Sequence, residues 1–417
     1  MKQTNSKIYY GWYIAGIAFW GYFLSVGTGF YAFNAFLEPL CNARGWSRTD
    51  LNLALVIGTV FGFSSQYIYG TILMKTGIRI LMLIGSLVAG ISFIFIAQVQ
   101  TLWEFYLFYS LLFIGNGAYG GIVASSAVNN WFVKKRGKAI GLATAGMSIS
   151  GAVIPIAALM LIQHTGLTSA ALYIGIIIAS LGPIAWFVVR DWPEDIGLAP
   201  DGLTGSNVNV LAEISQIQLP SLPSHKPQWN LNRLVHTDVF WKIGLAFGLL
   251  MIGTVGVMSQ LKPRFTDTGF SHMTAMLMMS TTALFGAAGK YIWGIMCDRF
   301  ESGHVAVFMA VANMMGLCLA LIKNSFFALL IFIPVFGFAM GGIMSTYPIM
   351  VAGIFGRENF ASVLRVISIF LVLQMFGYII AGQSYDRTGS YDTAYWIFIA
   401  LDMIAALLLF SLKKPAA

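Results

Sequence analysis

The sequence predicts an all-α membrane protein in which twelve transmembrane helices form two pseudo-symmetric six-helix bundles. Of the 417 residues, 58% are hydrophobic and only 10% are charged, whereas soluble domains contain roughly 25% charged residues. The apolar residues gather in runs long enough for membrane helices, which need about 20 such residues. One long polar segment separates six of these runs from the other six.

Twelve apolar runs can be placed along the chain. The first begins near Tyr10 and is too long for the core of a signal peptide. It also lacks a small-residue cleavage pattern before the next polar stretch, so we expect a retained helix. The runs span residues 10–37, 50–73, 80–99, 103–132, 139–162, 168–189, 238–261, 273–297, 304–322, 326–355, 360–383 and 392–412.

The stretch between Arg190 and His236 is polar and rich in proline, which disfavours a packed domain. Its prolines are Pro193, Pro200, Pro220, Pro223 and Pro227. We therefore expect an N-terminal six-helix bundle at residues 1–189, a cytoplasmic linker at 190–236 and a C-terminal six-helix bundle at 237–417.

Lysine and arginine predict the orientation, because cytoplasmic loops of membrane proteins carry an excess of positive charge. With the N-terminus inside, twelve basic residues fall in the short inner segments: Lys2, Lys7, Lys75, Arg79, Lys134, Lys135, Arg136, Lys138, Arg299, Arg357, Lys413 and Lys414. Only six fall in the outer segments: Arg44, Arg48, Lys262, Arg264, Lys323 and Arg387. This asymmetry places both termini and the linker on the cytoplasmic side of an inner (plasma) membrane. The scattered basic residues indicate topology rather than nucleic-acid binding.

The two groups of six helices share an internal repeat. The segment that starts at Gly70 after the second run recurs from Gly294 after the eighth, 224 residues later. A second pair joins residues 131–136 to residues 354–359 at nearly the same offset. Repeated halves of this kind place a substrate site near the membrane midplane between them, and they transport by rocking one half against the other.

The loops after the second and eighth runs resemble the signature loop of the major facilitator superfamily. The first copy retains Gly70, Lys75, Gly77 and Arg79 but has Met74 where the family has Asp. The second copy retains Asp298 and Arg299 but has Glu301 where Gly is usual. In that family the loop latches helix ends together by charge pairing, so the resemblance implies a conformational latch formed by Gly70, Lys75, Arg79, Asp298 and Arg299.

Five further segments resemble the monocarboxylate transporter and oxalate-formate antiporter branch of that superfamily. They are YYGW at 9–12, GWSR at 45–48, WFVKKRGKAIGLATAG at 131–146, RDWPEDIG at 190–197 and YDRTGSY at 385–391. The resemblance covers the whole chain and implies the major facilitator fold. It also implies secondary active transport of a small organic anion, a mono- or dicarboxylate, by alternating access with proton symport or anion exchange.

Lys290 is the main candidate for binding an anion. It precedes Asp298 by eight residues, which is about 12 Å along a helix, so it lies deep in the hydrocarbon core. A cation at that depth marks a polar cavity, a partner or a substrate; the alternative is a structural lysine bonded to neighbouring carbonyls. The resemblance aligns Lys290 with an arginine that meets the substrate carboxylate. It also aligns Gly286 with a proton-relaying Asp, and Tyr31 with a lysine of animal members.

Two further charged residues fall within apolar runs. Arg365 lies about 8 Å into its helix, so it could either reach the inner surface or bind substrate. In the oxalate-formate antiporter that this branch includes, the dicarboxylate binds between two cations. The resemblance aligns the second of these cations nearer Ile367 than Arg365. Asp402 falls in the middle of the last run, where it could pair with a neighbouring helix or carry a proton as a proton-coupling residue.

Several polar residues in the runs could offer hydrogen bonds to a bound carboxylate. Tyr119 and Tyr347 are the preferred pair, although tyrosines in membrane helices often serve only in packing. The full set of predicted substrate-binding residues is Lys290, Tyr119, Asn116, Tyr347, Arg365, Tyr31 and Gln374. Glycine-rich runs in the fourth and fifth helices favour close, movable helix contacts.

The sequence favours neither an enzyme nor a metalloprotein. It has no nucleotide-binding lysine motif and no Ser-His-acid arrangement, and Cys41, Cys297 and Cys318 lack metal-ligand spacing. We therefore expect no cofactor and a monomer whose partners are a small carboxylate, protons or a counter-anion, and the lipid bilayer. The alternatives are a receptor or sensor on a transporter scaffold, and efflux of a non-anionic small molecule.

Overall fold

The computed structural model describes residues 9–46, 48–201, 229, 231–322 and 325–412. Its regular elements in this part of the chain are helices, without a strand. The all-α prediction is therefore confirmed. Some of the residues considered in the sequence lie outside the described residues. They are Lys2, Lys7, Ser47, Lys323, Lys413 and Lys414, and the linker prolines Pro220, Pro223 and Pro227.

The first bundle contains the helices that precede the polar linker. They are α1 (Gly11–Val26), the π-helical turn η1 (Gly27–Tyr31), α2 (Ala32–Arg44), α3 (Arg48–Thr76), α4 (Ile78–Ile96), α5 (Leu102–Tyr119), α6 (Gly121–Trp131), α7 (Arg136–Thr165) and α8 (Leu167–Val188). Their apolar faces pack into one cluster of buried side chains, with Phe105, Trp131 and Phe132 among its largest members.

The second bundle follows the linker. Its helices are α11 (Asp238–Asp267), α12 (His272–Arg299), α13 (Ser302–Leu321), α14 (Phe326–Phe355), α15 (Phe360–Ile367), the 3-10 helix η3 (Ser368–Gln374), α16 (Met375–Thr388) and α17 (Asp392–Phe410). The described part of the linker forms two short helices, η2 (Pro193–Ile196) and α10 (Leu231–Val235).

Eleven helical segments in the described residues are long and apolar enough to cross a membrane. They coincide with eleven of the twelve predicted runs, and the remaining run forms α12. This helix has 28 residues, but its threonines, glycines and Lys290 lower its mean hydropathy, and it is not among the eleven. Its lower hydropathy distinguishes α12 from the other long helices of the described residues.

Three predicted runs are helical but not continuous α-helix. The run 10–37 contains the π-helical turn η1, and the run 360–383 contains η3. The run 103–132 breaks between α5 and α6, because Gly120 is extended and Gly121 has a φ of 46°, which favours glycine. Apolar periodicity could not predict these interruptions, because they depend on local backbone geometry.

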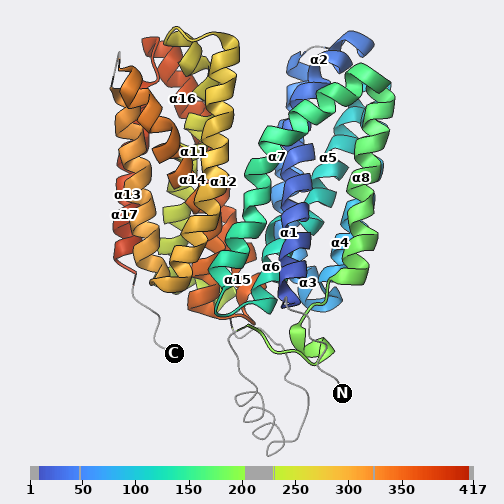
Figure 1. The fold of residues 1–417 in the computed structure, drawn as a ribbon, viewed down its shortest axis with the longest axis vertical. Helices are drawn as coiled ribbons and strands as arrows, with labels where there is room; N and C mark the ends of the chain where they lie inside the picture. The colour runs from blue at the N-terminus through green and yellow to red at the C-terminus, as the bar shows by residue number, and fades with distance from the viewer. Residues whose placement is uncertain (1–8, 47, 202–228, 230, 323–324, 413–417) are drawn as a thin grey trace, which may run out of the picture.

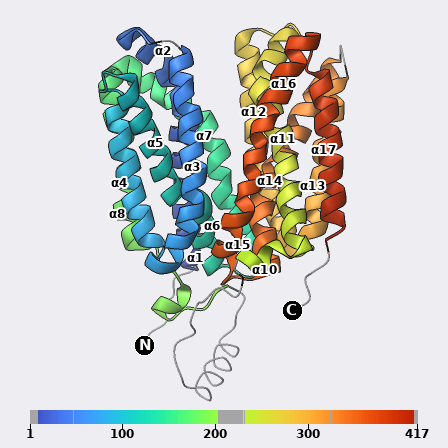
Figure 2. The same cartoon turned by 180° about the vertical axis from the view of Figure 1, so that it is seen from behind.

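The two bundles meet at one end and separate toward the other (Figures 1 and 2). Their contacts run between α7 and α12, between α7 and α14, and from α15 to α3 and α6. The end where α1 begins and α17 ends is called the closed end, and the opposite end, where α2 and α16 lie, the open end. The two bundles thus contact each other toward the closed end and diverge toward the open end.

Candidate functional site

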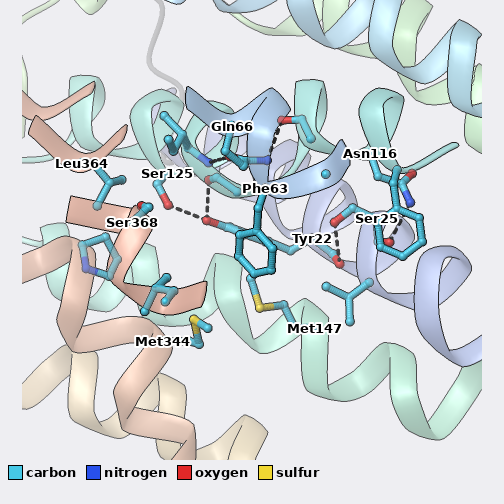
Figure 3. A pocket seen from close by; sticks show the side chains of 18 of the residues that line it. Tyr22, Ser25, Phe63, Gln66, Asn116, Ser125, Met147, Met344, Leu364 and Ser368 are labelled. Carbon is cyan, nitrogen blue, oxygen red and sulfur yellow. Dashed lines mark hydrogen bonds between the residues drawn. The ribbon is translucent and has the colours of Figure 1, made fainter. Parts of the chain in front are cut away.

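A cavity of about 240 Å³ lies between the two bundles. Its walls come from α1, α3, α5, α6 and α7 of the first bundle and from α14, α15 and η3 of the second (Figure 3). Its polar lining residues are Tyr22, Ser25, Thr59, Gln66, Asn116, Ser125, Tyr347 and Ser368. Among the described residues that line it, none has a charged side chain.

The rest of the wall is largely apolar. Its large side chains are Phe30, Phe63, Phe113, Met147, Met344 and Leu364. In Figure 3, Gln66 and Ser125 lie on one side of the cavity, and Met147 and Met344 lie on the opposite side. A small ligand would therefore meet polar groups on one side and flexible apolar side chains on the other.

Gln66 holds the break between α5 and α6. Its Oε1 accepts a hydrogen bond from the backbone N–H of Ile122 at 3.0 Å, and its Nε2 donates to the carbonyl oxygen of Gly117 at 3.2 Å. These bonds satisfy backbone groups that a helix break would leave unpaired. Gln66 thus allows a discontinuous helix in the cavity wall, a feature associated with substrate sites in secondary transporters.

Asn116 and Tyr119 lie together, but only Asn116 lines the cavity. Its Nδ2 donates to the carbonyl oxygen of Ser25 at 3.0 Å. Tyr119 is fully buried and donates from its hydroxyl to Oδ1 of Asn116. Tyr119, one of the two tyrosines that the sequence favoured for substrate binding, therefore positions Asn116 and does not itself line the cavity.

Tyr347 lines the cavity from the second bundle. Its hydroxyl forms a hydrogen bond of 3.0 Å with Oγ of Ser368, another lining residue. Tyr347 comes from α14 and Ser368 from η3, and Ser368 lies on the side of the cavity opposite Ser25 and Asn116 (Figure 3). Both bundles therefore contribute hydrogen-bonding groups to the cavity.

Lys290 is buried at the contact between the two bundles, with 6% of its surface exposed. Its Nζ donates a hydrogen bond of 2.6 Å to Oγ of Ser148, on α7 of the first bundle. Within the described residues, no acidic side chain forms an ion pair with it. Lys290 is not among the residues that line the cavity, although Met147, which precedes Ser148, is. The cation therefore lies beside the cavity wall, and its partner among the described residues is a neutral hydroxyl.

Gly286 lies one turn before Lys290 on α12. A Cβ at this position would lie 3.5 Å from Oγ of Ser148 and 3.1 Å from Cε of Met340. The position that the resemblance assigns to a proton-relaying Asp thus faces the same serine as Lys290, and this chain has no carboxylate there.

Arg365 faces the first bundle instead of the cavity. It donates hydrogen bonds to Oγ1 of Thr71 on α3 and to the carbonyl oxygen of Ser362, and its guanidinium lies 5.2 Å from the ring centre of Tyr67. Its neighbour Leu364 lines the cavity, whereas Arg365 does not. Arg365 thus joins the two bundles at the contact of α15 with α3.

Three other predicted residues lie outside the cavity wall. The ring of Tyr31 packs against Gly151 of α7, and Gln374 is half-buried at the end of η3. Asp402 is fully buried and accepts a hydrogen bond of 2.7 Å from Nδ2 of Asn313 on α13. The structure places this pair among α11, α13 and α17, away from the contact between the bundles.

The predicted latch residues occupy different environments. Oxygens of Asp298 accept hydrogen bonds from the backbone N–H groups of Gly137 at 2.5 Å and Lys138 at 2.8 Å, at the start of α7 in the other bundle. Burial raises the pKa of Asp298, although these two hydrogen bonds oppose the shift. Gly70 packs against the side chain of Arg365 across the bundles.

The remaining basic residues of the latch do not bridge the bundles in this arrangement. Arg79 lies over the ring of Trp186 within the first bundle, at 5.5 Å. Lys75 and Arg299 are exposed. Among the described residues, the second copy of the signature loop therefore contacts the opposite bundle through Asp298. The first copy contacts it through Gly70.

The sequence did not predict several residues at or beside the cavity. They are the lining residues Gln66, Tyr22, Ser125 and Ser368, and Ser148, which bonds to Lys290. A signal for Gln66 was present, because it precedes Lys290 by 224 residues, the offset of the internal repeat. The pseudo-symmetry thus relates the charged residue on one helix to a cavity-lining amide on its counterpart. The serines gave no such signal, since isolated hydroxyls are common in membrane helices.

Comparisons with known proteins agree with this architecture. The chain is 24% identical over 335 residues to the oxalate:formate antiporter of Oxalobacter formigenes, covering 78% of this chain and 73% of that protein. It is 23% identical over 352 residues to monocarboxylate transporter 12-B of Danio rerio, covering 80% and 72%. It is also 23% identical over 275 residues to the membrane sensor protein UhpC of Salmonella typhimurium, covering 66% and 61%.

A solved structure shows the same fold at low identity. The proton:xylose symporter XylE aligns with a TM-score of 0.78 at 15% identity, covering 96% of this chain and 95% of that one. The model of the Major Facilitator Superfamily matches residues 18–265 and 243–417. With its two helical bundles and the cavity between them, this chain belongs to the Major Facilitator Superfamily.

Proposed function

We propose that this multi-pass membrane protein is a secondary active transporter of a small organic anion, with Lys290 as the main charge partner of the substrate. It works by alternating access in the inner (plasma) membrane as a monomer with both termini cytoplasmic. The observation that carries the proposal is the buried lysine between the two bundles. Similarity to two proteins, an oxalate:formate antiporter and a monocarboxylate transporter, supports the substrate class.

A buried cation needs a compensating charge. Moving an ammonium group out of water is costly unless an anion or several hydrogen bonds replace its hydration. Lys290 has one such bond, to the Ser148 hydroxyl, and no acidic partner within the described residues. An anion that reaches the neighbouring cavity would supply the missing charge, which favours an anionic over a cationic substrate.

The same lysine can couple binding to movement. Its hydrogen bond to Ser148 joins α12 of one bundle to α7 of the other. A substrate carboxylate that takes the ammonium from Ser148 therefore removes one of the bonds that hold the bundles together. Because the predicted topology puts the closed end in the cytoplasm, the described arrangement corresponds to a transporter open to the outside.

Replacing Lys290 tests the proposal. Lys290→Met should abolish uptake of the transported anion into proteoliposomes, because it removes the charge but retains much of the side-chain volume. Lys290→Arg should retain measurable uptake. The matched control is Lys242→Met, since Lys242 lies at the surface near Asp238, away from the cavity. Unchanged uptake by a correctly folded Lys290→Met protein would refute the role of this lysine.

A sensor without transport activity is the rival function, and it is favoured by the similarity to the sensor UhpC. If the protein is a sensor, anions should bind and shift its unfolding temperature, but no counterflow should occur. Efflux of a neutral molecule is the third candidate, favoured by the uncharged cavity wall. It predicts transport that Lys290→Met leaves intact.

A further inference from the structure

We propose that the cavity selects a monocarboxylate with an apolar body and rejects dicarboxylates and polyhydroxylated compounds. This inference rests on the proposed function, because it takes the substrate to be an anion near Lys290. Three observations carry it: the placement of the charged residues near the cavity, the apolar wall, and the hydrogen bonds that the polar lining groups already make.

The charge around the cavity suits one carboxylate. Lys290 lies beside the wall, while Arg365, the other candidate cation, is turned to Thr71 and Tyr67 of α3. A second carboxylate on the substrate would be enclosed by a wall without a charged side chain among its described residues. Burying a charge without a partner is strongly unfavourable, so the cavity discriminates against dianions.

The apolar wall suits a hydrocarbon body. The rings of Phe30, Phe63 and Phe113 line the cavity, and Met147 and Met344 lie on the side opposite Gln66. Transfer of apolar surface from water to such a wall is favourable. Methionine side chains adapt to ligands of different shape. The volume of about 240 Å³ corresponds to roughly eight water molecules at about 30 Å³ each, enough for a body of several carbon atoms.

The polar lining groups are already paired with one another or with the backbone. Gln66 bonds to Gly117 and Ile122, and the Tyr22 hydroxyl donates to the carbonyl oxygen of Gly121 at 2.8 Å. The remaining pairs are Tyr22 with Ser125, Thr59 with Leu55, Asn116 with Ser25 and Tyr347 with Ser368. A substrate rich in hydroxyls would have to compete with these bonds, whereas an apolar body leaves them intact.

Three six-carbon compounds test the inference on the full-length protein in proteoliposomes. Hexanoate has one carboxylate, adipate has a second carboxylate in place of the methyl group, and hexanamide is the uncharged analogue of hexanoate. Binding is measured by thermal shift, and transport by competition in counterflow. We expect adipate to bind at least about a hundredfold more weakly than hexanoate, the order expected for an unpaired buried charge. Hexanamide should not compete.

Each alternative result has a definite meaning. Adipate binding as well as hexanoate would overturn the inference and leave the proposed anion transport standing. Hexanamide competing as well as hexanoate would overturn the proposed function, because the charge would then be irrelevant. Failure of all three compounds to bind would count against an apolar substrate body altogether.

A change in cavity size gives an independent test. Val26 lines the cavity, so Val26→Trp should reduce its volume and shift the preferred chain length from hexanoate toward butyrate or acetate. The matched control is Val56→Trp, because Val56 lies on α3 with 52% of its surface exposed and does not line the cavity. An unchanged chain-length profile in a folded Val26→Trp protein would contradict the assignment of the apolar body to this cavity.

Discussion

At the scale of single residues, several contacts between the bundles are hydrogen bonds that join polar or charged side chains of the second bundle to the first. Lys290 bonds to Ser148, Arg365 to Thr71, and Asp298 to the backbone at the start of α7. Each bond joins opposite bundles and would have to break if the closed end opens in the proposed alternating access. The stability of the closed arrangement is therefore distributed over a few polar contacts that can be tested one at a time.

Asp298 allows the clearest test at this scale. It accepts hydrogen bonds from two N–H groups at the first turn of α7, which is the role of an N-cap residue. Asp298→Ala should therefore weaken the closed end by about 0.5–2 kcal/mol, or about 2- to 30-fold in population. Asp298→Asn should weaken it less, because its single amide oxygen can still accept one of the two hydrogen bonds that the carboxylate oxygens accept from Gly137 and Lys138. The measurement is labelling of Thr59→Cys, a cavity position, by an impermeant thiol reagent from each side.

The same carboxyl group predicts a pH dependence. Burial raises its pKa in the closed arrangement, so the closed state binds a proton more readily than a state in which water reaches the group. Lowering the cytoplasmic pH through this raised pKa should therefore favour closure. Asp298→Asn should remove this dependence. Closure that weakens on acidification in the wild-type protein would show that the hydrogen bonds of the ionised form outweigh its burial.

At the scale of helices, the contact between α7 and α12 depends on glycine. A Cβ at Gly294 would overlap the carbonyl oxygen of Gly137, and one at Gly141 would overlap that of Lys290. Small residues let helix backbones approach closely in membranes. This close approach brings Lys290 within reach of Ser148, so the glycines position the charged residue as well as the helices.

Gly294→Val should force α7 and α12 apart at the closed end. Overpacking of this kind costs about 1–3 kcal/mol, which corresponds to about 5- to 150-fold in population. Labelling of Thr59→Cys should increase from the cytoplasmic side and decrease from the outside. The control is Gly382→Val on α16, where an added Cβ meets no atom within 4 Å. Equal labelling of both variants would show that this contact does not determine closure.

At the scale of the whole molecule, the proposed anion transport has two candidate driving forces, proton symport and anion exchange. Gly286 provides no carboxylate beside Lys290. Asp402 is the buried acid that remains as a proton-coupling candidate, but it packs against Asn313, not at the cavity wall. Any coupling through Asp402 would therefore act through movement of α13 and α17 within the second bundle.

Asp402→Asn distinguishes the two modes. If the protein is a symporter that uses Asp402, the variant should lose uptake driven by an acid-outside gradient while retaining counterflow. Asp238→Asn is the control, because the side chain of Asp238 is 88% exposed. Acid-driven uptake that survives in Asp402→Asn would make Asp402 a structural partner of Asn313. Uptake that depends only on internal anion would indicate exchange.

The sequence by itself determined the membrane residence, the helical class and the number of apolar runs, because a backbone that spans lipid must satisfy its hydrogen bonds within helices of about 20 residues. It also predicted Lys290 as an anion-binding candidate, since a charged residue in an apolar run is conspicuous against its surroundings. The repeat offset carried information on Gln66 as well. These features are local in the chain or depend on simple periodicity, so no tertiary contact was needed to predict them.

Only the tertiary structure decided which polar residues share a cavity. Ser148 meets Lys290, and Thr71 meets Arg365, through contacts between bundles that are far apart in sequence. It also placed Tyr119 behind Asn116 and put Arg365 outside the cavity wall, because the direction of a side chain depends on how its helix is rotated and broken. The physical reason is that membrane helices pack through small residues and a few polar contacts, and neither leaves a periodic signal in the sequence.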